Sequence, residues 1–318
     1  MKEIGGYIEF ENYFGTVYHE GAVALNCGRN CLAYLIEAEG IKKIRLPYFL
    51  CSSVRNVCLK YGTEVSFYHI GKDLKPIIDN DLAPDEWLYI VNYYGQLSND
   101  EVSALKQKYS RVIFDNSQSY FQHPADGVPT LYTCRKYFGV PDGAFLFTNK
   151  KLTRDIPRDE SFERIHYILG RYERTAGEFY KESSDNNHFF ADEPIKQMSK
   201  LTYDLLRSYD YDRIISRRTE NFKILHESLN GINKLNINVP EGAFMYPLYI
   251  ENGAEIRKKL QQMKIFVPTL WGDVFDTCDK NSLEYNYAEN ILPLPTDQRY
   301  DGEDMRYILE KLEETGVL

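Results

Sequence analysis

The sequence predicts an α/β protein with a large domain, in which helices sandwich a mostly parallel sheet, and a smaller C-terminal α/β domain. Strand-like and helix-like segments alternate through the first 150 residues, which is typical of an open parallel sheet. A charged, mainly helical segment follows at 151–230, and mixed patterns return in the last 90 residues. At 318 residues the chain has the length of about two domains. We place the large domain at 1–195, and the helical linker and small domain at 196–318.

The elements of the large domain follow from local patterns. Leu32, Leu35 and Ile36 have helical spacing, and Gly40 ends that helix. Asn99 is the expected cap of a later helix. The full expected series is helix 28–39, strand 41–46, helix 51–61, strands 64–70 and 87–95, helix 99–109, and strands 111–115 and 143–148.

The second half is predicted to start with a long helical stretch. It runs from residue 192 to about residue 229 and breaks near residues 210–212. Strand-like and helical segments then follow at 232–239, 243–252, 253–263, 264–270 and 302–315.

Composition and charge exclude several classes of protein. The net charge of −9 argues against nucleic acid as the main partner. We expect no signal peptide at the opening MKEIGGYIEF, and no transmembrane helix, because no apolar run is long enough. The six cysteines form no CxxC pair, and no histidines have metal spacing, so we expect a metal-free cytoplasmic protein with reduced thiols. His123 lies either near a pocket or in an ordinary loop.

The segment LNCGRN at 25–30 is the first with chemical potential. It stands directly before a helix, where free backbone N–H groups and the helix dipole favour an anion. Arg29 adds a full positive charge and forked donors. The segment is neither GxGxxG nor a Walker loop, so NAD and ATP folds are not indicated. Taken alone, such a segment is more often an ordinary capped helix start.

Two further residues lie where ligands bind in parallel-sheet proteins. Asp115 ends a buried strand, and Lys136 lies in the loop TCRKYFGVPDG at 133–143. A lysine in a partly desolvated pocket loses its proton more easily and can attack a carbonyl. Each has a simpler alternative, a turn-capping aspartate and a solvated surface lysine. The order of anion site, strand-end aspartate and loop lysine is what pyridoxal phosphate (PLP) requires for its phosphate, ring nitrogen and aldehyde.

The chain resembles the DegT/DnrJ family of sugar aminotransferases, which are PLP enzymes of fold type I, as an atypically short member. IGGYIEFE is similar to the family's opening, and NCGRNCL stands at its SGT phosphate loop. LPYFLCSSVRNVCLKYGTEVSFYHI and VNYYG are similar to the next two family segments. VIFDNSQSY resembles VIEDAAQA, SRRTEN resembles an R-R region, and ILPLPTDQRYDGEDM resembles the C-terminal LPL…ED stretch.

The resemblance implies a role for each matching residue. Asp115 would pair with the pyridine nitrogen, and Gln118 would contact the ring oxygen. Lys136 would bind the cofactor aldehyde covalently and then carry the proton. The phosphate contacts would come from Gly28, Arg29, Asn30 and Thr133. Of these, Thr133 is chosen without a true counterpart, because the spacing before the lysine is shortened.

The chain departs from the family pattern at two places. PDGA stands where the family has GEGG after the lysine. Cys51 stands where an aromatic residue usually stacks on the ring, with Tyr48 and Phe49 as alternatives. Aromatic pairs in several of these segments either line a pocket or pack in the core.

The expected function is PLP-dependent transfer of an amino group from an amino acid such as glutamate to a nucleotide-linked keto sugar. The resemblance implies a role in surface polysaccharide building and a cytoplasmic homodimer that binds neither nucleic acid nor membrane. A non-catalytic or regulatory protein of the same fold is one alternative, favoured by the two departures. A PLP enzyme of another reaction type is the other.

Overall fold

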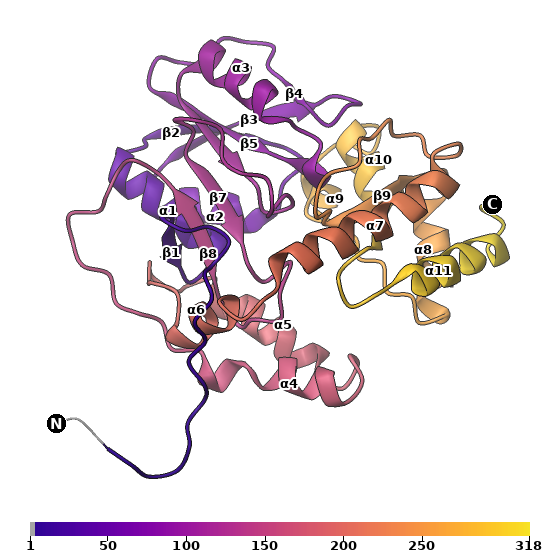
Figure 1. The fold of residues 1–318 in the computed structure, drawn as a ribbon. Coiled ribbons are helices and arrows are strands. Elements are labelled where there is room, and N and C mark those ends of the chain that lie inside the picture. Colours follow the sequence, from indigo (N-terminus) through magenta and orange to yellow (C-terminus); the bar gives the residue numbers. More distant parts are fainter. Residues whose placement is uncertain (1–3) are drawn as a thin grey trace.

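The large sheet has eight strands and is built from the first half of the chain (Figure 1). The computed structural model describes residues 4–318. The expectation of no signal peptide concerns the opening MKEIGGYIEF, and the first three residues of this segment lie outside the described range. The strand order is β1-β8-β7-β6-β5-β2-β3-β4. The strands are β1 (Val23–Leu25), β2 (Lys43–Pro47), β3 (Glu64–Ile70), β4 (Pro76–Ile77), β5 (Glu86–Val91), β6 (Val112–Asp115), β7 (Thr130–Thr133) and β8 (Ala144–Phe147).

Five neighbouring strands, from β7 to β3, are parallel, and the edges are antiparallel. The register brings several strand ends to one edge of the sheet. Ala144 at the start of β8 pairs with both Leu25 and Thr133, which end β1 and β7. Asp115, which ends β6, pairs with Leu131 and with Val91, the last residue of β5. This edge is where ligands bind in such folds.

Helices α1 (Gly28–Glu39), α2 (Ser52–Lys60) and α3 (Asn99–Tyr109) connect these strands. Helix α1 ends at Gly40, whose φ of 65° is left-handed, as the sequence predicts. The cap of α3 is Ser98 rather than the predicted Asn99. Ser98 and Glu101 form a reciprocal capping box, in which each side chain accepts the other residue's backbone N–H. That second contact decides between two adjacent residues that both have capping side chains.

The middle of the chain is helical but less continuous than predicted. It holds η2 (Phe162–Arg164), α4 (His166–Glu173), α5 (Tyr180–Phe189), α6 (Lys200–Leu206) and α7 (Tyr211–Leu229). The predicted break is present, and Asp210 caps α7 through the N–H of Arg213. Residues 192–199 are not helical, because their backbone bonds to the large sheet unit: Asn26 N–H donates to Lys196, and Met198 N–H donates to Ala24.

The second lobe is centred on an antiparallel pair, β9 (Met245–Tyr249) and β10 (Ile291–Pro295). Four helices accompany this pair, α8 (Gly253–Gln262), α9 (Val274–Thr277), α10 (Leu283–Asn290) and α11 (Gly302–Glu314), and α7 runs towards them from the sheet lobe (Figure 1). The predicted strands 232–239 and 264–270 do not form. The Asn233 side chain accepts the N–H groups of Leu235 and Tyr249, and Lys264 has a left-handed φ of 63°.

The predicted fold class is confirmed, since helices flank a mainly parallel sheet and a small α/β lobe follows. The boundary at residues 195–196 stays a prediction. In the described part of the chain no helix is long and apolar enough to cross a membrane.

The paired aromatic residues near the sheet edge belong mainly to the core. Seven of these side chains are buried, and Tyr48 is half-buried: Phe49, Tyr93, Tyr94, Tyr120, Phe121, Tyr137 and Phe138. Core packing therefore accounts for most of these aromatic pairs.

Candidate functional site

Asp115 is a buried carboxylate at the functional edge of the sheet. Its Oδ2 accepts a 2.7 Å hydrogen bond from the Tyr89 hydroxyl, and its Oδ1 accepts the N–H of Ser117 at 2.8 Å. These two donors fix the orientation of the carboxylate. Each oxygen keeps a lone pair with which it can accept from a bound cationic group.

Lys136 reaches the same place from the loop after β7. A tight turn carries it, in which the N–H groups of Tyr137 and Phe138 bond to the Cys134 carbonyl. Its Nζ donates to the Ser117 hydroxyl at 2.9 Å. The side chain is exposed, yet desolvation by the protein around it lowers the pKa of the amine. The negative charge of Asp115 acts in the opposite direction and raises the pKa of the amine.

Gln118 is fixed with its amide nitrogen free to donate. Its Oε1 accepts the backbone N–H of Tyr94 at 2.8 Å, and a backbone N–H can only donate, so the amide orientation is determined. Tyr94 has a left-handed φ of 54° within a short turn at Tyr93–Gly95. The strand predicted over 87–95 therefore stops at Val91, and the turn brings the Tyr94 N–H to Gln118.

The start of α1 has the features of an anion site. No side chain caps this helix, and its first turn has no acidic residue, so the free N–H groups and the dipole face outward. Thr133, at the end of the neighbouring β7, has a buried hydroxyl with no hydrogen-bond partner in the described part of the chain. Gly28 lies so close that a Cβ there would stand 2.7 Å from the Thr133 Cγ2 atom. Gly28 and Thr133 thus form one cradle for an anion. The sequence predicts these two residues as phosphate contacts only through the family resemblance.

Two arginines stand beside this cradle. Arg29 donates to the Asn187 carbonyl at 3.0 Å, and Arg135 donates to the Asn187 side chain. Burial lowers the pKa of Arg135, and the nearby charge of Arg29 lowers it further. The Arg135 Nε is buried with no partner in the described residues. Like charges that lie together with an unsatisfied donor favour a bound anion. No pattern in the sequence singles out Arg135, although it directly precedes Lys136.

Asn30 is not turned towards this cradle. Its side-chain amide donates to Asn26 at 2.8 Å and to the Pro194 carbonyl at 2.7 Å. Its backbone N–H bonds to Cys27. The side chain of Asn30 therefore stabilises the loop on the side away from the cradle. It has no free donor for the predicted phosphate contact.

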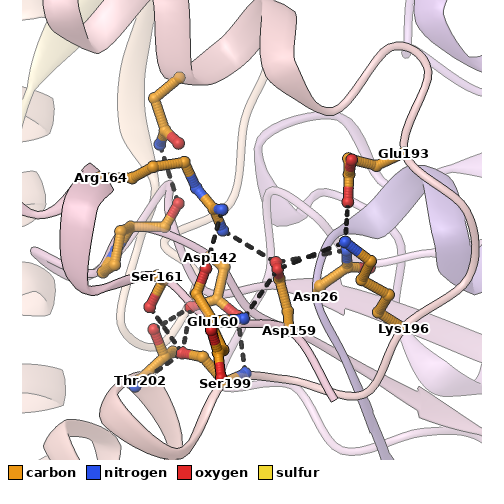
Figure 2. A network of polar contacts seen from close by, with 12 residues as sticks. Asn26, Asp142, Asp159, Glu160, Ser161, Arg164, Glu193, Lys196, Ser199 and Thr202 are labelled. Atoms are coloured by element: carbon orange, nitrogen blue, oxygen red, sulfur yellow. Dashed lines mark hydrogen bonds and ion pairs between the residues drawn. The ribbon is translucent and has the colours of Figure 1, made fainter. Parts of the chain in front are cut away.

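A polar network anchors the same loop (Figure 2). Asp159 lies in its centre, with Arg164 on one side at 2.8 Å and Lys196 on the other at 3.8 Å. Asp159 also accepts from Asn26 at 3.5 Å. Asp142 lies in the same picture and accepts the N–H of Ser199 at 2.8 Å. Because Asn26 and Asp142 flank the anion cradle and the lysine loop, the network holds both in place.

The departure PDGA after the lysine has a structural reason. Asp142 is buried, and it accepts from Ser199 and from Thr202 at the start of α6. Gly143 has a φ of 110°, and a Cβ there would stand 2.9 Å from Thr202. The loop is thus built to hold α6 against the sheet.

The candidates for the stacking aromatic do not face Lys136. Phe49 packs on Tyr93 and Trp271, with the Trp271 ring at 4.4 Å, and Tyr48 stacks on Phe67 and His69. Cys51 is exposed and close enough to raise the pKa of Lys136, which places it near the amine. The His123 ring stacks on Tyr18 at 5.3 Å, and the backbone carbonyl of His123 accepts from the Asn99 side-chain amide at 3.1 Å, so neither contact is to a site residue.

The second lobe completes the wall around the lysine. The Phe244 ring lies 5.6 Å from the Lys136 Nζ. Arg218 of α7, which is 1% exposed, donates to the carbonyls of Ala243 at 2.9 Å and Tyr137 at 3.1 Å. Arg218 belongs to the segment SRRTEN, for which the family resemblance implies no role. It ties the lysine loop to the second lobe.

The residues present fit PLP. The unpartnered Thr133 hydroxyl, the glycine cradle and two arginines match a phosphate, and Asp115 and Gln118 offer an acceptor and a donor for the ring. Lys136 is an accessible amine with a lowered pKa beside them. The described residues hold no group of three or more His, Cys, Asp or Glu side chains that fits a metal ion.

Replacing Gly28 by alanine is expected to move the start of α1 away from β7. The added Cβ meets Thr133 Cγ2 at 2.7 Å, and such overpacking costs about 1–3 kcal/mol. Urea unfolding and PLP titration measure the loss of stability and of affinity. Thr133→Ser removes the clashing methyl group and should restore the Gly28→Ala protein. Gly177→Ala, which meets only open space, is the control. A Gly28→Ala protein that matches this control would contradict the cradle.

Several solved structures have a similar fold, and aminotransferases are among them. The chain is similar to a DegT DnrJ EryC1 StrS aminotransferase from Brucella abortus, with a TM-score of 0.64 and 14% identity over 93% of this chain and 86% of the other. NtdA from Bacillus subtilis with bound cofactor PMP gives 0.65 and 13% over 92% and 72%. DesI in the presence of its TDP-sugar product gives 0.65 and 13% over 93% and 80%.

The search against protein-family models found no match, and neither did the search of curated proteins. The predicted resemblance is confirmed at the level of the fold, which the chain shares with these proteins.

Proposed function

We propose that this protein is a PLP-dependent aminotransferase. One observation carries the proposal, the convergence of an accessible Lys136 amine, the fixed Asp115 carboxylate and the anion cradle at Gly28 on one edge of the sheet. These are the three groups that this cofactor needs, and the structural neighbours have the same fold.

Each residue has a distinct task in this proposal. Bound PLP supplies an aldehyde and a ring that draws electrons from an attached amine. Asp115 accepts from the ring nitrogen and keeps a proton there, and Gln118 donates its amide N–H to the ring oxygen. Gly28, Arg29, Arg135 and Thr133 hold the phosphate. Lys136 attaches the cofactor and afterwards carries a proton as a general base, for which its lowered pKa is suited.

The substrates are proposed by class. The amino donor is an amino acid such as glutamate, and the acceptor is a keto sugar linked to a nucleotide. DesI, which shares the fold, was solved with a TDP-sugar product, and this supports the acceptor class. Building of surface polysaccharide is the process that this reaction would serve.

A spectroscopic titration tests the proposal. Purified protein mixed with PLP should develop an absorbance band near the boundary of the visible and ultraviolet. Glutamate should bleach this band, and a nucleotide-linked keto sugar should restore it. The absence of any band would contradict PLP binding.

A second function, a non-catalytic PLP-binding protein, is favoured by one observation. Neither Tyr48 nor Phe49 faces the lysine, so neither aromatic alternative lies where the ring would stack. A band that forms but responds to no amino donor would support this function over the aminotransferase. Conversion of an amino acid without transfer of its amino group would indicate another PLP reaction.

Replacing Arg135 by glutamine is expected to weaken PLP binding about tenfold or more, because a hydrogen-bonded charge next to a phosphate is lost. Pyridoxal, which lacks the phosphate, should bind both proteins equally. The ratio of the two dissociation constants is the measurement. Arg154→Gln, which breaks only an exposed pair with Glu37, is the control. Equal weakening of PLP and pyridoxal would show that Arg135 acts through the fold instead.

We further propose a cytoplasmic homodimer. The segment 4–11 extends away from the rest of the chain (Figure 1), and its apolar side chains are exposed, with Tyr7 at 96% and Ile8 at 93%. Tyr172 and Tyr180 of α4 and α5 are also exposed. Exposed apolar groups in such number favour a protein partner. Sedimentation should give a dimer for the full chain and a monomer after deletion of residues 1–11. A monomeric full chain would contradict the proposal. The six free cysteines suit a reducing compartment.

A further inference from the structure

Ser117 lies between the two central groups of the site and contacts both. Its backbone N–H donates to Asp115 Oδ1 at 2.8 Å, and its hydroxyl accepts from Lys136 Nζ at 2.9 Å. The residue is buried, with 6% of its surface exposed. One residue therefore links the carboxylate and the amine.

The position of the Ser117 hydroxyl is set by a rigid turn. The N–H of Asn116 bonds to Leu131 at 2.9 Å, and the N–H of Ser119 bonds back to Asn116 at 2.9 Å. The Asn116 side chain accepts from Asn92 at 3.0 Å, which ties the turn to the end of β5. The turn that carries Lys136 is hydrogen-bonded as well. A hydrogen bond between two fixed turns selects one direction for the lysine.

We infer that Ser117 is a positioning residue, whose hydroxyl receives the Lys136 amine whenever this amine is free and holds it beside Asp115. The inference rests on the proposed function for its role in turnover, since the amine is free whenever a substrate amine has displaced it. A lysine that is held in this way stays close to the substrate carbon. It must carry a proton between this carbon and the cofactor.

The hydrogen bond also biases the protonation of Lys136. An ammonium group can only donate, and a charge-assisted bond to the hydroxyl favours the protonated form. The titratable groups that act on this amine are Asp115 at the end of β6 and Cys51 before α2, and both raise its pKa. The Phe244 ring on the second lobe also favours a cation. Burial acts in the opposite direction and dominates.

Trace acetylation of the full chain without cofactor tests the inference. Acetic anhydride reacts only with the unprotonated form of a lysine amine. Trypsin cuts after Arg135, so acetylated Lys136 appears in a peptide that spans residues 136–150. Ser117→Ala should raise the acetylation rate of Lys136 at neutral pH about tenfold, the effect of losing one hydrogen bond to a charged group. The pH midpoint of the reaction should fall.

Three further variants make the result specific. Ser117→Thr keeps the hydroxyl and should react like the unchanged protein. Ser117→Cys keeps the volume with a weak acceptor and should follow Ser117→Ala, even where the alanine variant folds poorly. Ser119→Ala removes a neighbouring buried hydroxyl, which donates to Gln122 at 2.9 Å, and should have no effect.

An unchanged rate in Ser117→Ala, or an equal rise in Ser119→Ala, would overturn the inference. The assay contains no PLP, so its outcome is independent of whether the cofactor binds. Failure of the PLP band would contradict the proposed function and leave the measured link between Ser117 and Lys136 standing.

Discussion

Replacing Lys136 by alanine is expected to abolish the PLP absorbance band and to lower amino transfer by about 1,000-fold or more, the effect of removing both the covalent attachment and the proton carrier. The Lys136 amine is accessible, and it donates to the hydroxyl of Ser117, whose backbone N–H donates to Asp115. The measurements are the spectrum of the protein with PLP and the rate of keto acid formation from glutamate.

Two variants separate chemistry from charge. Lys136→Arg keeps the cation but provides no nucleophile, so it should lose the band as well. Lys108→Ala, an exposed lysine of α3, should change neither the band nor the rate. A band of normal intensity in Lys136→Ala would show that another lysine binds the cofactor and would refute the assignment.

Replacing Arg218 by alanine is expected to lower the free energy of unfolding by about 3–5 kcal/mol, because a buried charge with several hydrogen bonds is removed and carbonyl groups are left without donors. Arg218 donates to Gln298, Ala243 and Tyr137 at 2.6, 2.9 and 3.1 Å. Its burial lowers the pKa of the guanidinium to about 10, which leaves it charged at neutral pH. Urea unfolding measures the loss.

The adjacent arginine provides a matched control. Arg217 is partly exposed and pairs with Glu220 at 3.8 Å, so Arg217→Ala should cost less than about 1 kcal/mol. Arg218→Lys keeps a charge but cannot reach all the carbonyls, and it should fall between the two. Equal stability of the Arg217 and Arg218 variants would contradict the linking role of Arg218.

The sequence predicts those parts of the fold that local patterns determine. Periodic apolar residues and a left-handed glycine define α1, and α11 follows from the same kind of pattern. The compact apolar run before Asp115 predicts a buried strand that ends at this carboxylate. The order of anion site, aspartate and lysine along the chain sufficed to suggest the cofactor.

The parts that local patterns do not determine depend on contacts between distant residues. The segment 232–239 has strand-like composition, but the Asn233 side chain binds Tyr249, 16 residues away. In the sequence, Arg135 is one more loop residue. In the structure, Arg135 and Arg29 both donate to Asn187, which is 52 residues after Arg135, so the two arginines lie side by side. Arg218 and Tyr137 are 81 residues apart. Such partners are set by the tertiary fold, which pairwise spacing in a single sequence does not reveal.

The register of β1, β8 and β7 has a consequence for how this architecture tolerates change. Leu25 and Thr133 both pair with Ala144, so backbone hydrogen bonds set the separation between the anion cradle and the lysine loop. Such bonds are indifferent to side-chain identity, which is why 14% identity suffices for a common fold. Exposed segments away from these strands can therefore be exchanged, while the pairing of three short strands keeps the chemical centre in place.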